Sequence, residues 1–156
     1  MLSNMEVVNM DERDIDYVLA NPWEVSKDEL NAFGIECWNW KMTVRTLWVN
    51  SKYASALRLN DATVAILGGY LTDDGIWRTW FLASDLFPLH AKDATKTTRK
   101  FLREAFKRET PAQVISITAS AREDAENWFR LIGFARAPEY DYHKSGRHFR
   151  GFSMKG

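Results

Sequence analysis

Apolar residues recur along this chain with two different periods, and each period predicts a different element. One segment carries apolar residues three or four positions apart: Ala125, Trp128, Phe129 and Ile132. This spacing places them on one face of a helix. Gly133 follows directly, where a left-handed residue that ends a helix is most easily a glycine. The segment predicts a helix over residues 122–132 that turns straight into a strand.

The same analysis of the remaining chain predicts alternating strands and helices. Strands are predicted at residues 5–10, 54–59, 63–70, 76–82, 114–118, 134–138 and 148–154. Helices are predicted at residues 12–21, 26–34, 35–50, 91–109 and 122–132. A polar loop that includes Gly146 joins the last two strands. The order indicates an α+β fold, with an antiparallel meander, one parallel crossover and helices on both faces of a mixed central sheet.

Two helix starts carry local capping signals. Asp11 precedes a turn rich in acidic residues, where the helix dipole favours negative charge. Ser26 has Glu29 three positions later, which is the spacing of a capping box. The sequence therefore predicts that Ser26 begins the second helix and that Glu29 folds back onto its first turn.

Composition narrows the class of protein. The 156 residues favour one domain spanning 1–156, and 46% apolar residues are enough for a substantial core. No apolar run approaches the roughly 18 residues that a membrane helix needs, and no signal peptide is expected at the start. The single cysteine, Cys37, excludes an internal disulfide, and we expect it to be a buried thiol. The three histidines show no metal-ligand spacing, so no metal is expected.

The helix that ends at Gly133 and Phe134 resembles the late helix and strand of the GNAT N-acetyltransferase fold, and the predicted order of elements matches that fold over almost the whole chain. A narrower group is also similar: the GNAT-like proteins of tailed bacteriophages, which include the internal virion protein A. Six parts of the sequence carry this resemblance: 75–77, 80–85, His90, 99–101, 127–134 and 149–154. It implies a phage protein located in the virion or the host cytoplasm, with a role in virion assembly or genome ejection.

The GNAT resemblance implies an acetyl-CoA site between the last meander strand and the long helix. The residues at the corresponding positions are Leu82, Ala83, Ser84, His90, Ala91 and Lys92. In the family, glycines in this connection let backbone N–H groups approach the pyrophosphate. Residues 84–92 contain no glycine, Pro88 lacks an N–H, and Asp85 adds a negative charge. This departure argues against ordinary acyl-CoA binding, so no cofactor is the expectation and acetyl-CoA the alternative.

The family also implies a general base on the meander and a tyrosine that acts as general acid. The strand at residues 76–82 offers only Arg78 and Thr79 as polar side chains. Tyr140 and Tyr142 follow the late helix and are the candidates for the general acid, although aromatic residues at such positions more often serve packing. The sequence thus has the fold pattern of an acyltransferase without a complete catalytic set.

The long helix carries a basic face. Its members are Lys92, Lys96, Arg99, Lys100, Arg103 and Lys107. A solvated face explains this pattern, and so does a binding surface for an acidic protein partner or for nucleic acid. The net charge of zero weakens the nucleic-acid interpretation. Tryptophans in the N-terminal half favour contacts with other phage or host proteins.

Two functional hypotheses follow. In the first, the chain is a phage GNAT-like protein that works through protein contacts without acyl transfer. In the second, it is an acetyl-CoA-dependent N-acetyltransferase that modifies a host protein or a small amine. An open crevice beyond residue 82 with free backbone N–H groups near residues 89–92 would favour the second hypothesis, and a blocked crevice would favour the first.

Overall fold

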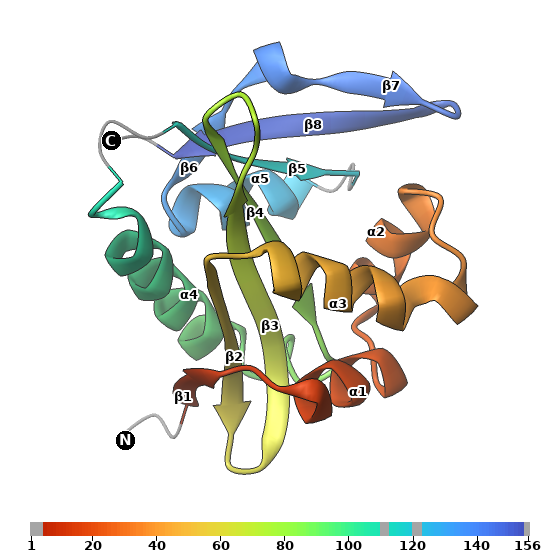
Figure 1. Ribbon diagram of the computed structural model, residues 1–156, viewed down its shortest axis with the longest axis vertical. Helices are drawn as coiled ribbons and strands as arrows, with labels where there is room; N and C mark the ends of the chain where they lie inside the picture. Colours follow the sequence, from red (N-terminus) through yellow and green to blue (C-terminus); the bar gives the residue numbers. More distant parts are fainter. Residues whose placement is uncertain (1–4, 110–112, 120–122, 155–156) are drawn as a thin grey trace.

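The fold is built on one mixed sheet, seen in Figure 1. The computed structural model describes residues 5–109, 113–119 and 123–154. The strands lie in the order β1-β2-β3-β4-β5-β8-β6, and β7 pairs with β8. Only β4 and β5 form a parallel pair among the described strands; the other pairs are antiparallel. The predicted meander and single parallel crossover are therefore confirmed.

The strands are β1 (Met5–Asn9), β2 (Tyr53–Leu59), β3 (Ala62–Leu71), β4 (Ile76–Ala83), β5 (Gln113–Thr118), β6 (Phe134–Arg136), β7 (Tyr142–Lys144) and β8 (Arg147–Met154). The helices are α1 (Glu12–Ala20), α2 (Glu24–Ala32), α3 (Trp40–Asn50), α4 (Ala91–Phe106) and α5 (Glu123–Leu131). Short 3₁₀ turns are η1 (Cys37–Asn39) and η2 (Pro138–Tyr140). None of the described helices is long and apolar enough to cross a membrane.

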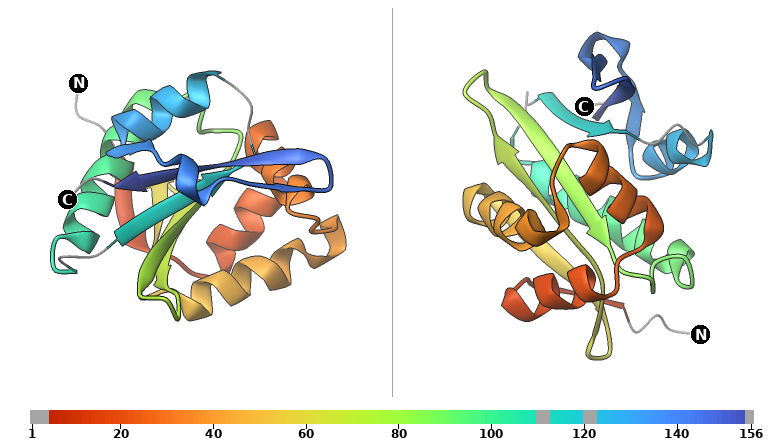
Figure 2. Two further views of the ribbon diagram at one scale, coloured as in Figure 1. Left: turned by 90° about the horizontal axis from the view of Figure 1, so that it is seen from above. Right: turned by 90° about the vertical axis from the view of Figure 1, so that its right-hand side faces the viewer.

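Helices cover both faces of the sheet, as Figure 2 shows. Helices α1, α2 and α3 pack on one face, where Ile15, Leu30 and Val44 meet Ile66 of β3 in one core cluster. Helices α4 and α5 pack on the other face, where Leu102 and Phe129 belong to a second cluster. In both clusters each helix buries the one apolar face that the spacing of its apolar residues predicts.

Several element boundaries follow from local chemistry. The Asp11 side chain accepts from the N–H groups of Arg13 and Asp14, so the predicted cap of α1 is confirmed. Gly133 ends the turn after α5 with φ of +107°, a conformation that a side chain would strain. These two positions fix where α1 begins and where the chain turns into β6.

Other predictions are wrong in detail. Helix α2 begins at Glu24, two residues before Ser26, and the Ser26 hydroxyl does not cap it but accepts from the Ala83 N–H and ties α2 to β4. Helix α4 ends at Phe106, three residues before the predicted end. The polar loop before β8 contains a strand, β7, which pairs with β8 across a turn at Ser145 and Gly146. Arg122, the predicted start of the late helix, lies outside the described residues.

Cys37 was expected to be a buried thiol, and it is exposed on η1. Its neighbours in sequence are Glu36 and Trp38, and the chain there forms a single 3₁₀ turn that leaves Cys37 and Trp38 in solvent. The nearby tryptophans differ among themselves, since Trp40 is buried while Trp48 is partly buried.

The feature that positions the site is the divergence of β4 from β5. The two strands pair at Ile76 with Gln113, Trp77 with Val114, and Arg78 with Ile115. Beyond Arg78 no ladder pair joins the described residues of these strands. Because β4 continues to Ala83, about half its length faces an opening instead of a neighbouring strand. A parallel pair that separates in this way leaves a crevice at the carboxyl ends of its strands.

Candidate functional site: a groove between two diverging strands

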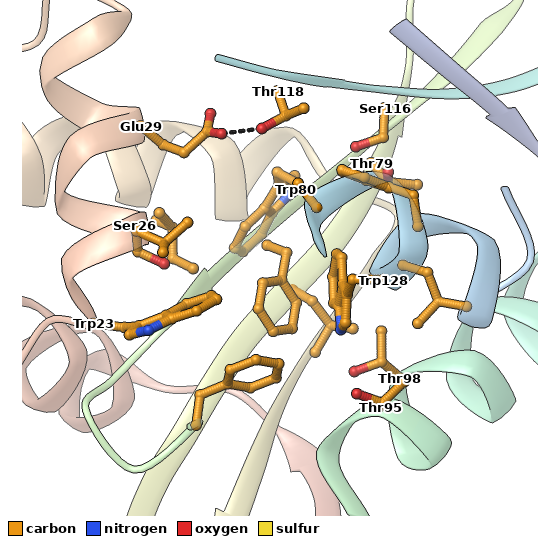
Figure 3. Close-up of a pocket in the computed structure, with 18 of the residues that line it drawn as sticks. Trp23, Ser26, Glu29, Thr79, Trp80, Thr95, Thr98, Ser116, Thr118 and Trp128 are labelled. Atoms are coloured by element: carbon orange, nitrogen blue, oxygen red, sulfur yellow. Dashed lines mark hydrogen bonds between the residues drawn. The ribbon is translucent and has the colours of Figure 1, made fainter. Parts of the chain in front are cut away.

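A groove of about 940 Å³ occupies the opening between β4 and β5 (Figure 3). It is lined by residues from α2, α3, β4, β5, α4 and α5. The groove therefore reaches both faces of the sheet, through the gap where the strands separate. A concave, largely apolar site with a few polar groups is the usual form of a small-molecule site.

Aromatic side chains form most of the wall near the end of β4. Phe81 lies with its ring centroid 4.9 Å from that of Trp128 and 5.5 Å from that of Phe87. Trp23, which precedes α2, packs 4.8 Å from Phe87. These rings come from four separate segments, so the groove is held in shape by contacts that are distant in sequence.

The N-terminus of α4 lies at one end of the groove. Ala91, Lys92, Thr95 and Lys96 line it. The first N–H groups of a helix have no partner inside the helix, and no side chain caps this end of α4 among the described residues. With two lysines beside it, this end of the groove is suited to negative charge.

The connection from β4 to α4 forms no glycine cradle. The N–H groups of Leu89 and His90 donate to the Leu86 carbonyl at 3.2 Å, so the connection spends these donors on its own turn. Pro88 lines the groove without an N–H. Among the described residues at this end of the groove, the donors for an anion are the first turn of α4 and the two lysine side chains.

The residues inferred for acetyl-CoA separate into two sets. Leu82, Ala91 and Lys92 line the groove. Ala83 donates its N–H to Ser26, and the buried Ser84 hydroxyl donates to the Thr63 carbonyl at 2.6 Å. These two residues and His90 are not among the described lining residues. Their assignment to the cofactor stays a prediction.

Two buried polar atoms in the wall have no hydrogen-bond partner among the described residues: Thr98 Oγ1 and Trp128 Nε1. In Figure 3 the nitrogen of the Trp128 ring points toward the part of α4 that carries Thr95 and Thr98. An unsatisfied buried polar group costs about 1–3 kcal/mol. A ligand with an amide or hydroxyl beside α4 and α5 would remove that cost.

The opposite end of the groove carries a carboxylate that the sequence did not reveal. Glu29 of α2 lines the groove and accepts a hydrogen bond from the Thr118 hydroxyl of β5. Its two oxygens also accept from the Ala119 N–H, at 3.1 and 3.2 Å. The predicted capping box assigned Glu29 a local role. Its partners lie 89 and 90 residues away, so no local signal in the sequence marked this contact.

The two polar residues of β4 lie where β4 and β5 begin to separate. Arg78 and Thr79 both line it. Thr79 Oγ1 donates to the Ile115 carbonyl at 3.4 Å, next to the last ladder pair of β4 and β5. Both side chains therefore mark the point where the strands separate.

The two candidate tyrosines lie elsewhere. Tyr140 belongs to η2 and packs against Gly151, and Tyr142 of β7 stacks on Phe149 with ring centroids 4.8 Å apart. Neither is among the described residues that line the groove. A role for either as general acid stays a prediction.

The basic face of α4 contains residues that line the groove and residues that do not. Lys92 and Lys96 line the groove, while Arg99, Arg103 and Lys107 are exposed further along the helix and are not among the lining residues described. The sequence grouped these residues as one partner-binding surface. That role stays a prediction for all five, and the first two have a second possible role at the groove.

The mixed sheet, its diverging strands and the helices on both faces define the fold of the GNAT N-acetyltransferases. Among solved structures, the aminoglycoside acetyltransferase AAC(6')-Ib in complex with paromomycin and acetyl-CoA matches with a TM-score of 0.69 and 12% identity. The match covers 98% of this chain and 94% of that one. A GNAT acetyltransferase from Bacillus anthracis matches with a TM-score of 0.65 and 10% identity, over 99% of this chain and 96% of that one.

A chimera of the spermidine N-acetyltransferase SpeG from Vibrio cholerae and hSSAT also matches, with a TM-score of 0.66 and 9% identity over 97% of this chain and 95% of that one. No protein-family model matches the chain, and no curated protein matches it in sequence. At these identities the likeness shows the fold alone.

Proposed function

We propose that the groove binds an acyl-CoA thioester and that the chain transfers the acyl group to an amine. One observation carries the proposal: β4 and β5 separate after Arg78 and open a groove that runs from the N-terminus of α4 to Glu29. The solved structures of the same fold that contain acetyl-CoA or coenzyme A support this choice of ligand.

The α4 end of the groove fits the phosphates of the donor. Lys92 and Lys96 supply two positive charges, and the first turn of α4 supplies N–H groups and the positive end of its dipole. This set replaces the glycine-rich cradle that residues 84–92 lack. Because both lysine side chains are exposed, we expect phosphate binding here to depend strongly on salt.

The middle of the groove fits the arm that joins the phosphates to the thioester. That arm carries two amides, and the wall offers two unpaired polar atoms, Thr98 Oγ1 and Trp128 Nε1. Beyond Arg78, the side of β4 that faces the groove also has backbone groups without a partner in β5. An extended ligand arm with amide groups can form hydrogen bonds with these two side-chain atoms and with the backbone groups of β4.

The proposed reaction is a direct attack by the acceptor amine, held in position beside the thioester, and it involves no covalent intermediate on the chain. The nitrogen of the neutral amine attacks the carbonyl carbon of the thioester and forms a C–N bond. The C–S bond then breaks, the thiolate leaves, and the proton lost from nitrogen ends on sulfur. The chain's own contribution is to hold the two reactants at opposite ends of an aromatic-walled groove and to exclude water between them.

Thermal unfolding of the chain with and without acetyl-CoA tests this proposal. A ligand present at about 100 times its dissociation constant adds roughly 2.7 kcal/mol to the free energy of unfolding. For a domain of this size the expected rise in Tm is roughly 5–10 °C. An unchanged Tm at millimolar acetyl-CoA would overturn the proposal.

A second candidate function is supported by other observations. The glycine-free connection with Pro88 and the exposed side chains Trp38, Met42 and Val49 fit a GNAT-fold protein that acts through protein contacts. The resemblance to phage proteins would place it in a virion or the host cytoplasm, with a role in assembly or genome ejection. The same unfolding experiment separates the two functions, because this one requires no response to acetyl-CoA.

A further inference from the structure

An arginine without a partner lies at the point where β4 and β5 separate. Arg78 lines the groove and is the last residue of β4 that pairs with β5. Its side chain is partly buried, and its guanidinium forms no hydrogen bond or ion pair with any residue that the structure describes. A cation in a largely apolar groove is stabilised by an anion, and the planar fork of arginine matches a carboxylate.

A tyrosine lies beside Arg78 on the neighbouring strand. Tyr70 of β3 is directly opposite Arg78 in the antiparallel ladder, and it also lines the groove. Opposite residues in a ladder place their side chains on the same face, with Cβ atoms about 5 Å apart. Within the described part of the chain, the Tyr70 hydroxyl has no hydrogen-bond partner. The two side chains can therefore donate to the same anion.

The alternation of side chains along β4 places Arg78 on the face of the sheet that α2 and α3 cover. Trp80, two residues further along, packs with Leu30 of α2 in the core cluster on that face. Phe81 points the other way and packs with Trp128 of α5. Because the groups assigned to the donor belong to α4 and α5, Arg78 lies on the side of the opening that is left for the acceptor.

Arg78 is also distant from the end of the groove that fits the phosphates. It precedes Ala83, the last residue of β4, by five positions, which is about 16 Å along a strand. Lys92 and Lys96 lie beyond that end, on α4. The anion that Arg78 binds is therefore a different group from the phosphates of the donor.

The wall on the α2 and α3 side of the groove is mostly apolar. Its side chains include Leu30, Phe33, Ile35, Leu47 and Trp80. The Trp80 Nε1–H donates to the Ser51 hydroxyl at 2.9 Å, which fixes the plane of that ring against the wall. Such a wall favours an acceptor with an apolar body, and a flat ring in particular, because aromatic pairs gain more than their buried area.

We propose that the acceptor is an α-amino acid with an apolar side chain, and that Arg78 and Tyr70 bind its carboxylate. This proposal rests on the acyl-CoA function proposed above. With the carboxylate at Arg78, the amino group lies one carbon away, at the opening where the thioester meets its acceptor. The apolar side chain packs against Phe33 and Trp80.

The reaction of such an acceptor balances without any further reactant. The ammonium group first loses one proton to solvent, and the neutral nitrogen then attacks the carbonyl carbon of the thioester. The C–N bond forms and the C–S bond breaks. A second proton leaves the nitrogen and ends on the departing thiolate, so the products are an N-acyl amino acid and the CoA thiol.

The test compares two acceptors that differ in the carboxylate: L-phenylalanine and L-phenylalaninamide. Release of the CoA thiol and the mass of the product are measured with the full chain and saturating acetyl-CoA. We expect kcat/KM for L-phenylalanine to exceed that for the amide by about tenfold or more, because a hydrogen bond to a charged group is lost with the carboxylate. The amide has the less basic amine, so a difference in amine protonation would favour the amide. An equal or higher kcat/KM for the amide, or no transfer to L-phenylalanine by a protein that acetyl-CoA stabilises, would overturn the inference.

Free glycine tests the apolar wall, because it carries the same carboxylate and amine without a side chain. We expect its kcat/KM to be about tenfold or more below that of L-phenylalanine, since the benzyl group buries apolar area in the groove. Equal values for the two amino acids would contradict the proposed preference for an apolar side chain.

Variants separate carboxylate binding by Arg78 from a structural role. Arg78→Met keeps an unbranched side chain and loses the charge, so we expect the preference for L-phenylalanine over its amide to fall below about threefold, with an unchanged KM for acetyl-CoA. Tyr70→Phe removes one donor and should reduce the preference by a smaller factor. Arg130→Met is the matched control, since Arg130 is exposed on α5 and is not among the described lining residues. A wild-type preference in Arg78→Met, or an equal loss in Arg130→Met, would contradict the role of Arg78.

Binding without catalysis distinguishes this inference from the proposed function. With coenzyme A present, we expect L-phenylalanine to raise the Tm of the wild-type chain and not that of Arg78→Met. A response to acetyl-CoA without a response to L-phenylalanine would contradict only the inference. Absence of a response to acetyl-CoA would contradict the acyltransferase function itself, and with it the inference that rests on it.

Discussion

Arg58 of β2 donates two hydrogen bonds to the fully buried carboxylate of Asp14 on α1, at 2.8 and 2.6 Å. Thr63 of β3 donates a third, at 2.6 Å. Burial by itself would raise the pKa of Asp14, but the hydrogen bonds from Arg58 and Thr63 hold it below its usual value. The carboxylate therefore stays charged and connects the first helix to the centre of the sheet.

Removal of Arg58 would leave a buried charge without its main partner. We expect Arg58→Met to lower the free energy of unfolding by about 3–5 kcal/mol, because the methionine fills the space and cannot pair with Asp14. Urea denaturation at pH 7 measures this. Lys41→Met is the control, since Lys41 pairs with Asp16 at 2.8 Å on the exposed surface, and its urea midpoint should stay close to that of the wild-type chain. Similar losses in both variants would contradict the expected difference.

The basic face of α4 gives a test of the groove with a control on the same helix. Lys92 and Lys96 line the groove, whereas Arg99 and Arg103 are not among the described lining residues. We expect Lys92→Ala with Lys96→Ala to weaken the binding of coenzyme A about tenfold or more, and to reduce its salt dependence, because two charges beside the phosphates are lost.

The control variant combines Arg99→Ala with Arg103→Ala. It removes the same amount of charge from the same helix, so we expect the affinity for coenzyme A to change less than threefold. Titration calorimetry at two salt concentrations measures both variants. If the two double variants weaken binding equally, the effect comes from the general charge of the helix, and the groove is not the site of the phosphates.

The sequence predicted the elements well wherever the deciding chemistry was local. Asp11 caps α1 from two and three residues away, and Gly133 ends the turn after α5 with a positive φ. Apolar spacing also identified two buried residues, Phe129 of α5 and Ile132 in the turn directly after it. These features depend on neighbours within one or two turns of chain, and neighbours in sequence can be read directly.

The sequence failed where a residue's partner lies far along the chain. Ser26 looked like a helix cap, but it accepts from the Ala83 N–H across 57 residues. Glu29 looked like the second half of the same capping box, but it contacts Thr118 in the groove. Strand β7 was missed because its polar sequence is held by pairing with β8. In each case tertiary contacts replaced the role that local propensity indicated.

A close approach inside β3 gives a prediction about packing. A Cβ at Gly68 would lie 2.5 Å from the Tyr53 carbonyl oxygen and 2.8 Å from the Trp80 ring. We expect Gly68→Ala to lower the free energy of unfolding by about 1–3 kcal/mol or more, because the backbone of β2 has to shift. Trp80 also lines the groove, so this variant should weaken the binding of acetyl-CoA.

Gly75 is the comparison position for Gly68, because an added side chain there would strain the backbone without a steric clash. It has φ of +78° in the turn before β4, and nothing lies within 4 Å of an added Cβ. We expect Gly75→Ala to lower the free energy of unfolding by about 1–2 kcal/mol through conformational strain alone, and to leave the affinity for acetyl-CoA unchanged. Thermal unfolding with and without the ligand measures both variants. A loss of ligand response in Gly75→Ala would contradict this separation.

Asp141, which follows η2, holds the C-terminal strands together through charge. Its carboxylate accepts from Arg136 at 2.6 and 2.5 Å and from the Gly151 N–H at 2.8 Å. His148 lies 2.9 Å away and stacks on His143. The hydrogen bonds from Arg136, with those from Gly151 and His148, hold the pKa of Asp141 well below its usual value.

A lowered pKa in the folded state fixes the sign of the pH dependence. In the unfolded chain Asp141 takes up a proton near pH 3.9, about the ordinary value for aspartate. In the folded chain it is protonated only at a lower pH. Stability from Asp141 is therefore fully present above that pH and is lost as the pH falls toward the folded pKa. We expect Asp141→Asn to lower the urea midpoint at pH 7 and to flatten the decline between about pH 5 and pH 2. Asp73→Asn, in the exposed turn before β4, should leave the midpoint unchanged, and a wild-type slope in Asp141→Asn would contradict the assignment.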